Sequence, residues 1–593
     1  MSIKTYKTPC LVIGSGCAGF NGADWLYDLG FTDVILVTEG LNMGTSRNTG
    51  SDKQTYYKLA LSSDCTDSVG RMAESYFKGQ AMSGELALCE SANSAACFFK
   101  LFGLGVPFPQ NEYGEILGYQ TDHDDTKRAT SAGPLTSKFM TEALEKSVNA
   151  KGINIVDNVV VFKLFAKDGK ISGALGVDKK SGQYVLFETP AILMATGGSA
   201  ALYRDSVFPP SQTGMSGMAI ELGAKTSNLT EWQYGLASID FRWNVSGSYQ
   251  QVLPRYVSVD EEGVEREFLY DSLTSEEVLL YTFRKGYQWP FDSRKKDASS
   301  LVDLLVHKEV LAGRKVYMDF MNNPKTYDEN NLPEEAYTYL KNSDAFGEKP
   351  IDRLIAMNKR AYQLYLDHNI DLKTEYLRVA VCAQHENGGI AVDKNYQSAI
   401  DGLYVAGESA GVFGVYRPGG SALNSTQVSS MRAAQHIKKV NRQMPESVLA
   451  EAEEFIKNIC ENGEKVSFSE EITKIQAKMS DYAAFLRDED KIKEMKTEVE
   501  EKLSKVFCYA VKKENVVAFV KYRDLLITAN EILSALILWC DEIGARGSAM
   551  GKNSEKQDDS GIVICTESGR AYTEKPSPIP ESEVWFEKVY NRQ

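Results

Sequence analysis

The chain lacks several patterns by which functional classes are recognised. Histidine occurs only five times in 593 residues, at His123, His307, His368, His385 and His436, which argues against a histidine-rich metal enzyme. None of the ten cysteines forms a CxxC pair. The sequence therefore contains no motif for an iron–sulfur cluster, a zinc ribbon or c-type haem attachment. Scattered thiols favour a reducing compartment, so we predict a cytoplasmic protein without a metal site.

Basic charge and long apolar runs are also scarce. Lys and Arg number 66 against 81 Asp and Glu, which gives a net charge of −15 and argues against a nucleic-acid partner. The apolar run from Ile532 to Cys540 is broken by Ser534 and falls far short of the roughly 20 residues that span a bilayer. We therefore predict no transmembrane segment. Glycines interrupt the apolar stretch near the N-terminus, so we interpret it as a strand and not as a signal peptide.

A glycine-rich turn is the first positive signal. Residues 10–39 read as an apolar strand, a turn with Gly14, Gly16 and Gly19, a helix, and a second strand that ends at Glu39. Such a turn lets the backbone approach a pyrophosphate while Glu39 is placed for a ribose diol. GxGxxG alone is a weak signal, and a packing turn is the alternative. Between a strand and a helix it predicts dinucleotide binding, although it does not separate NAD from FAD.

Two later strands favour FAD. The apolar strand that ends in Ala195, Thr196 and Gly197 lies about 150 residues after Glu39, and another closes at Glu408. In flavoproteins a late strand of this type returns the chain to the middle and the flavin end of the cofactor.

The remaining chain divides by composition. Residues 55–105 read as helices and 155–195 as strands, whereas 226–352 is rich in aromatic and charged residues and looks inserted. From Pro445 onward the pattern is helical and charged. Apolar residues between 522 and 540 follow i, i+3, i+4 spacing, which predicts an amphipathic helix that ends near Gly544.

Several motifs together resemble one family. GSGCAG, SRNTG at 46–50, ATGG, GLYVAGESAGVFG at 402–414 and RPGGSAL at 417–423 are similar to the flavoprotein subunits of succinate dehydrogenase and fumarate reductase. L-Aspartate oxidase and the adenylylsulfate reductase flavoprotein are related to these. ARGS at 545–548 resembles the SRGAH of the family.

The resemblance implies an α/β fold with five segments. A Rossmann-like FAD-binding domain occupies 1–225 and 353–440, an inserted α+β capping domain 226–352, a helical bundle 441–560, and a C-terminal tail 561–593. The expected FAD ligands are Gly14, Gly16, Ala18, Gly19, Glu39, Gly40, Ser46, Asn48, Thr49, Gly50, Ala195, Thr196, Gly197, Glu408, Ser421 and Leu423. Asn48 stands where membrane-bound succinate dehydrogenases attach FAD to a histidine, so we expect non-covalent FAD.

The resemblance also implies the catalytic residues. His385, in AQHENGG, and Arg417, in VYRPGG, match residues that hold a substrate carboxylate in the family. The proton-donor arginine of the family falls in the segment 292–299. A one-residue gap places Arg294 there, which we favour because a planar guanidinium suits a carboxylate, whereas a strict register places Lys295 there.

One carboxylate clamp is missing. The family segment QxHPT corresponds to 233–237, where neither its His nor its Thr is present. Gly235 and Leu236 instead make room and an apolar wall near Trp232, Tyr234 and Trp243. This departure favours a monocarboxylic or bulkier unsaturated acid. Alternatively Ser238 replaces the clamp and fumarate remains the substrate.

The predicted function is hydride transfer between flavin N5 and the C=C bond of an unsaturated carboxylic acid, with an arginine as proton donor. Electrons would come from a separate iron–sulfur protein or another donor, because the chain has no haem or cluster motif. The alternatives are a flavoenzyme like aspartate oxidase or adenylylsulfate reductase, and an electron-transfer protein without a substrate of its own.

Overall fold

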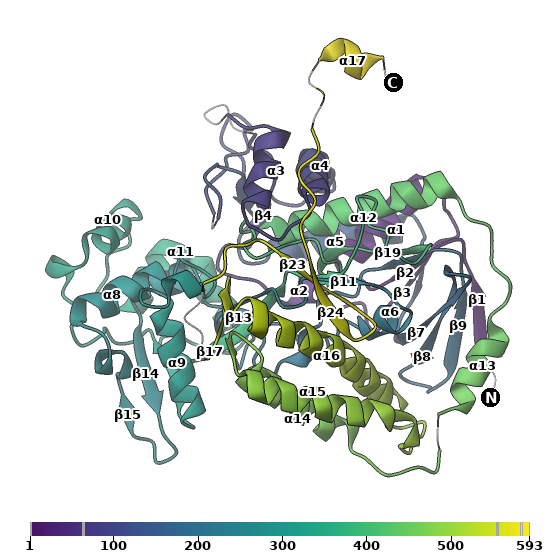
Figure 1. Ribbon diagram of the computed structural model, residues 1–593. Coiled ribbons are helices and arrows are strands. Elements are labelled where there is room, and N and C mark those ends of the chain that lie inside the picture. Colours follow the sequence, from purple (N-terminus) through teal and green to yellow (C-terminus); the bar gives the residue numbers. More distant parts are fainter. Residues whose placement is uncertain are drawn as a thin grey trace.

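The computed structural model describes residues 3–61, 66–121, 123–459, 461–552, 557–581, 583 and 585–591 (Figure 1). Its central feature is a five-stranded parallel sheet in the order β19-β10-β2-β3-β6. These strands are β2 Leu11–Ile13, β3 Ile35–Val37, β6 Asn154–Val156, β10 Ile192–Met194 and β19 Leu403–Val405. Every neighbouring pair is parallel. The carboxyl ends of these strands therefore meet at one edge, where α/β sheets bind their ligands.

The predicted βαβ unit is confirmed, because helix α1 Cys17–Asp28 connects β2 to β3. Helix α1 packs against α12 Ser421–Val440 and α5 Thr136–Ala150, and α12 also contacts α4 Gly84–Gly103. Figure 1 shows α12 as the long green helix that runs alongside α1. The segment after the late strand thus returns to the first helix of the chain.

Smaller elements surround this unit. An outer sheet has the order β1-β9-β8-β7, with β1 Lys4–Lys7, β7 Val159–Lys167, β8 Lys170–Asp178 and β9 Tyr184–Glu188. The other elements here are α2 Thr45–Asn48, β4 Thr55–Tyr57, α3 Val69–Phe77, β5 Ala129–Ser131 and α6 Gly217–Glu221. Helices over 69–103 and strands over 159–194 confirm the two compositional predictions for this region.

A six-stranded antiparallel sheet lies beside the parallel one, in the order β13-β12-β17-β16-β14-β15. Its strands are β12 Trp232–Ser238, β13 Trp243–Asn244, β14 Arg255–Val259, β15 Glu265–Arg266, β16 Lys315–Asp319 and β17 Leu377–Glu386. Its helices are α7 Ser248–Gln251, α8 Ser275–Arg284, α9 Leu301–Leu311, α10 Glu334–Asn342 and α11 Pro350–Asp367. The sheet thus extends past residue 352, because β17 pairs with both β12 and β16.

The C-terminal part is helical, as predicted. Its helices are α13 Leu449–Lys457, α14 Phe468–Tyr482, α15 Glu489–Ser504 and α16 Val516–Glu542, followed by the short α17 Phe586–Tyr590. Short strands β20 Leu486–Arg487, β21 Ala545–Arg546 and β22 Ala549–Gly551 form a small sheet. Among the described residues, the helices lack the combination of length and apolar composition that crossing a bilayer requires.

Part of the segment predicted as a tail is folded. Strands β23 Val563–Glu567 and β24 Arg570–Glu574 form a hairpin, and β23 pairs with β11 Thr226–Ser227, which pairs with β18 Gly389–Ile390. The hairpin packs on α16, as Figure 1 shows. The hairpin therefore contributes to the hydrophobic core, in which Ile564 is fully buried.

Candidate active site

A cavity of about 920 Å³ begins at the carboxyl edge of the parallel sheet and reaches the six-stranded sheet. This volume is near the upper end of the roughly 300–1,000 Å³ that ligand pockets occupy. Residues that directly follow β2, β3, β10 and β19 line one part of it, and residues 286–292 line another. The cavity therefore connects the predicted dinucleotide site with the inserted region.

The glycine turn is built for close backbone approach. Gly14 has a φ of 110°, and a Cβ there would lie 2.3 Å from the carbonyl oxygen of Ala195. A Cβ on Gly19 would lie 1.9 Å from the carbonyl oxygen of Gly14, so α1 packs tightly on the turn. Gly16 precedes α1 and lines the cavity. A helix N-terminus in this position favours a phosphate group, so the turn fits the pyrophosphate of FAD.

Glu39 follows β3 and lines the cavity, as the spacing predicts. Its Oε1 lies 2.6 Å from Nζ of Lys521 and 3.6 Å from Nζ of Lys179. Helix α16 thus contributes a cation to the far end of the dinucleotide site. Sequence analysis missed this contact, because Lys521 lies 482 residues from Glu39.

Most predicted cofactor residues line the cavity. They are Gly14, Gly16, Ala18, Glu39, Gly40, Ser46, Thr49, Gly50, Ala195, Thr196, Gly197, Glu408 and Leu423. Gly19, Asn48 and Ser421 are not among the lining residues. The Asn48 amide donates to the carbonyls of Asn42 and Gly44, and the Ser421 hydroxyl donates to the carbonyl of Pro418. These two side chains therefore shape the loops beside the cavity.

Two buried carboxyl groups lie close together, that of Glu408 just after β19 and that of Glu386 at the end of β17. Oε1 of Glu408 accepts from the backbone N–H of Glu386, and Oε2 of Glu386 accepts from the N–H of Ser199 at 2.6 Å. Burial raises the pKa of Glu386 to about 8, and the nearby Glu408 adds to this effect. Burial also raises the pKa of Glu408 to about 7. This part of the cavity can hold a proton near neutral pH.

His385 and Arg417 both line the cavity, so the structure brings the two predicted carboxylate ligands into one site. His385 stands opposite Gln233 in the β12–β17 ladder. Oε1 of Gln233 accepts a 2.5 Å hydrogen bond from Arg417, which also lies 3.3 Å from Oγ of Ser421. Strand pairing thus holds His385 beside the group that orients Arg417.

Arg294 and Lys295 face different surroundings. Arg294 makes two hydrogen bonds to the Asp292 carboxylate, at 3.1 and 2.9 Å, and stacks over the ring of Tyr416 at 3.9 Å. Its side chain is 43% exposed and is not among those that line the cavity. Lys295 does line it, with Nζ 3.9 Å from Asp292. The 3₁₀ turn over 293–295 therefore directs the lysine, and not the arginine, toward the cavity.

The position of the missing clamp is filled by other side chains. A Cβ on Gly235 would lie 2.8 Å from the ring of Trp289 and 3.0 Å from the amide of Gln384, and both of these residues line the cavity. Gly235 therefore admits Trp289 and leaves no room for a substrate there. The apolar wall comes from residues 289–291, whereas Trp232, Tyr234, Leu236 and Trp243 are buried away from it. The expectation of an apolar wall at Leu236, near Trp232, Tyr234 and Trp243, is therefore wrong.

Ser238 does not replace the clamp. Its hydroxyl donates to the carbonyl of Phe241 and lies 2.7 Å from the hydroxyl of Tyr365, at the opposite end of β12. Sequence analysis also missed residues of the loop 119–124, of the segment 211–215, and Gln384 and Ser548, all of which line the cavity. No motif marks them. The aromatic composition around 289 was the one available signal.

In the described part of the chain, no group of three or more His, Cys, Asp or Glu side chains is arranged to hold a metal ion. Arg417 and Lys295 instead contribute two cationic side chains to the cavity lining, which also contains the Glu408 carboxyl. Cationic side chains of this kind can bind an organic anion.

Residues 10–423 match the family described as FAD binding domain. One component of the fumarate reductase (CoM/CoB) of Methanothermobacter marburgensis is 25% identical over 472 residues, which cover 78% of this chain and 79% of that protein. The L-aspartate oxidase of Bacillus subtilis is 24% identical over 349 residues, 56% of this chain and 54% of that protein. The structure of Mycobacterium smegmatis Sdh1 in complex with UQ1 superposes with a TM-score of 0.77 at 18% identity, covering 97% of this chain and 95% of that chain. This last similarity shows a shared fold.

Proposed function

Because this chain belongs to the FAD binding domain family and is an FAD-dependent oxidoreductase, we propose that it reduces the C=C bond of an unsaturated carboxylic acid, or runs the reverse desaturation. The observation that carries the proposal is the single cavity that joins the glycine turn to Arg417, Lys295 and His385. The similarity to a fumarate reductase supports the same chemistry.

Different lining residues would hold different parts of FAD. The N-terminus of α1, with Gly14 and Gly16, would hold the pyrophosphate, and Glu39 would bind the ribose of the adenosine. Residues 49–50, 195–197 and 408 would hold the ribityl chain and the flavin. Bound FAD supplies a ring nitrogen, N5, that exchanges a hydride with a substrate carbon.

We expect FAD to be bound without a covalent bond. Asn48 carries an amide that donates to two backbone carbonyls of its own loop, and an amide does not form the bond that an imidazole forms with flavin. Acid precipitation should therefore release all yellow colour into the supernatant. Flavin that stays with the precipitate would contradict this expectation.

Arg417 is the proposed anchor for the acid. A guanidinium can bind a carboxylate through two parallel hydrogen bonds. Gln233 fixes one side of this guanidinium and so limits the directions from which a carboxylate can approach. His385 would contact the same end of the acid. The walls formed by Trp289 and Phe291 would exclude water from the bond that is reduced.

Lys295 is the better supported proton donor of the two candidates. It lines the cavity, whereas Arg294 is bound to Asp292 and stacked on Tyr416. Burial alone would raise the pKa of Asp292, but the hydrogen bonds and charge of Arg294 outweigh it and the pKa lies below the usual value. Asp292 thus stays ionised beside Lys295 and holds its ammonium group in place. Arg294 would act through Asp292.

Electrons must reach the flavin from a separate donor, and we propose an iron–sulfur or other redox protein for this role and a cytoplasmic location for the reaction. The deciding experiment is anaerobic. Dithionite-reduced holoprotein is mixed with fumarate, crotonate and cinnamate, and the return of oxidised flavin absorbance is followed. Reoxidation by at least one acid, and its loss in Arg417→Ala, is the expected result.

The same experiment separates the alternatives. An electron-transfer protein without a substrate would stay reduced with every acid. In separate assays, an enzyme of the aspartate oxidase type would release hydrogen peroxide in air with an amino acid, and the reduced flavin of an adenylylsulfate reductase type would be reoxidised by adenylylsulfate. Any of these results without reoxidation by an unsaturated acid would refute the proposal.

A further inference from the structure

His123 lines the cavity but has no part in the mechanism above. It lies on the loop between α4 and β5. Its ring centroid is 5.2 Å from that of Tyr416, the residue that precedes Arg417. A histidine from a distant loop is thus brought next to the proposed carboxylate anchor.

The backbone of His123 is held in an unfavourable conformation. Its φ is 60°, in the left-handed region that is unfavourable for residues other than glycine. The flanking residues fix it there. The hydroxyl of Thr121 donates to the carbonyl of Gly419 at 3.1 Å, and Tyr119 pairs with Ala129 in a backbone bridge. Such strain persists only where the surrounding structure imposes it, and it is concentrated at functional sites.

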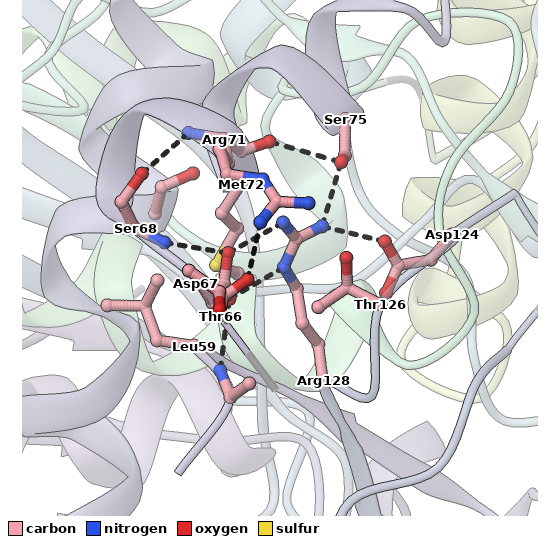
Figure 2. Close-up of polar contacts among 12 residues, drawn as sticks. Leu59, Thr66, Asp67, Ser68, Arg71, Met72, Ser75, Asp124, Thr126 and Arg128 are labelled. Atoms are coloured by element: carbon pink, nitrogen blue, oxygen red, sulfur yellow. Dashed lines mark hydrogen bonds and ion pairs between the residues drawn. The ribbon is translucent and has the colours of Figure 1, made fainter. Parts of the chain in front are cut away.

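A buried ion-pair network anchors the other side of the loop (Figure 2). Arg128 is 1% exposed, pairs with Asp124 at 2.6 Å and with Asp67 at 2.8 Å, and donates to Ser75 at 2.7 Å. Asp124 directly follows His123. Because a buried charge without its partner is strongly destabilising, this network holds the loop in one position. His123 is therefore presented to the cavity by a rigid support.

The surroundings of His123 carry an excess of positive charge. Arg417, Lys295 and Arg294 act on its ring, with Asp292 as the opposing carboxylate. Both oxygens of Asp292 already accept from Arg294. Asp124 is likewise paired with Arg128. Burial has the largest effect on the pKa of His123 and lowers it, Asp292 raises it, and the three cations lower it further. The resulting pKa is about 4, so the ring is neutral and offers an N–H donor. An anion is the ligand that this excess of cations would attract.

The two histidines line the same cavity but have different neighbours. The charge of Arg417 lowers the pKa of both His385 and His123. His385 has Glu408 as a neighbour, with Nε2 3.9 Å from that carboxyl, whereas His123 has Asp292 and Lys295. An acid held at Arg417 and His385 would therefore extend its other end toward His123.

We propose that His123 is a specificity residue that donates a hydrogen bond to a second carboxylate of the substrate, so that unsaturated dicarboxylic acids are preferred over monocarboxylic ones. The inference rests on the proposed function, since it concerns the same cavity. The loop that carries His123 would thus supply the carboxylate contact that segment 233–237 lacks.

The test compares two three-carbon acids without a reducible bond. Malonate and propionate are titrated into the oxidised FAD holoprotein, and the change in flavin absorbance gives each dissociation constant. His123→Gly removes the ring without adding backbone strain, because glycine tolerates a φ of 60°. Malonate binding should weaken about 10-fold or more, as expected for a hydrogen bond to a charged group, and propionate binding less than about twofold.

Asn369→Gly is the matched control, because Asn369 has a φ of 61° and is exposed outside the cavity; it should change neither constant. Should His123→Gly not fold, His123→Asn keeps a residue that accepts this backbone, and its shorter side chain should weaken malonate selectively. Equal weakening of both acids, or unchanged malonate binding, would overturn the inference. If no acid reoxidises the wild-type protein but malonate binding still depends on His123, the proposed function is refuted and the role of His123 in binding stands.

Discussion

Nδ1 of His385 lies 3.0 Å from the side-chain oxygen of Asn387, whose amide nitrogen donates to the carbonyl of Gly414. The Asn387 oxygen can therefore only accept, which places a hydrogen on Nδ1 of His385. Burial, and then the charge of Arg417, hold the pKa of His385 well below 6.5. The ring is thus neutral, and its Nε2 carries a lone pair toward the cavity.

A carboxylate that approaches Nε2 requires the ring to take up a proton. We therefore predict that binding of the carboxylic acid is accompanied by uptake of about one proton and weakens as pH rises above the pKa of the free ring, which lies well below 6.5. Titration calorimetry in two buffers of different ionisation enthalpy measures this uptake. His385→Asn should abolish it, because an amide donates without a proton.

His436→Asn is the control for this measurement, since His436 contacts Tyr404 outside the cavity. It should retain the uptake seen in wild type. If His385→Asn takes up as much proton as wild type, the proton goes to another group, with Glu386 and its pKa of about 8 the first candidate.

Lys295 and Arg294 differ in what surrounds them, and this difference predicts their effects on rate. Lys295→Met should slow single-turnover reoxidation of the reduced flavin by an acid about 100-fold or more, the range expected for loss of a general acid. Arg294→Met removes the neighbouring cation, one position earlier in the chain. It should slow the step less than about 10-fold, because Arg294 acts through Asp292. The reverse ranking would restore Arg294 as the donor.

Gly235 is tightly enclosed, so a single added carbon should disturb the packing around it. Gly235→Ala places a Cβ 2.8 Å from the Trp289 ring and 3.0 Å from Gln384. We expect a loss of about 1–3 kcal/mol in the free energy of unfolding, as for other overpacked positions, and a higher KM for the acid because Trp289 lines the cavity. Gly103→Ala is the control. A Cβ there meets nothing within 4 Å, and in helix α4 it should leave stability equal or slightly higher. An unchanged KM in Gly235→Ala would show that Trp289 does not shape the substrate site.

The sequence predicted the parts of the site that local pattern determines. Gly14 and Glu39 belong to one strand–turn–helix–strand unit, in which short-range geometry fixes the spacing between the turn and the acidic residue. The late strand β19 was recognisable because parallel strands buried on both faces are continuous apolar runs. Both features depend on residues close together in the chain.

Contacts between distant segments were beyond the same reasoning. Trp289 occupies the space at Gly235 because a loop from one element folds over a strand of another. Lys521 reaches Glu39 from the last long helix. His123 sits in a polar loop without periodicity, and only the Arg128 network reveals that this loop is rigid. The hairpin over 563–574 was missed for a related reason, since its strands are short and gain their stability from β11 and α16.

Glu90 lies outside the cavity, on helix α4, and offers a test of stability that is independent of the cofactor. Its carboxyl accepts from the hydroxyl of Tyr396 at 2.5 Å and from the amide of Asn424 at 2.9 Å. Burial raises the pKa of Glu90 from 4.5 to about 7, against the effect of these hydrogen bonds. The folded protein therefore holds a proton on Glu90 at a pH where the unfolded chain has released it.

Because the folded state binds this proton more tightly than the unfolded state, the free energy of unfolding falls as pH rises. The stabilising contribution is complete below pH 4.5, and it is lost as pH rises toward about 7, by at most about 1.4 kcal/mol per pH unit. Glu90→Gln keeps the shape and removes the titration. Relative to wild type, the variant should gain stability between pH 5 and 7 and show a constant difference above that range, measured by urea unfolding at each pH. Glu85→Gln removes a solvent-exposed carboxyl from the same helix and serves as the control. A difference between Glu90→Gln and wild type that does not vary with pH would mean that Glu90 is already ionised when buried, stabilised by Tyr396 and Asn424.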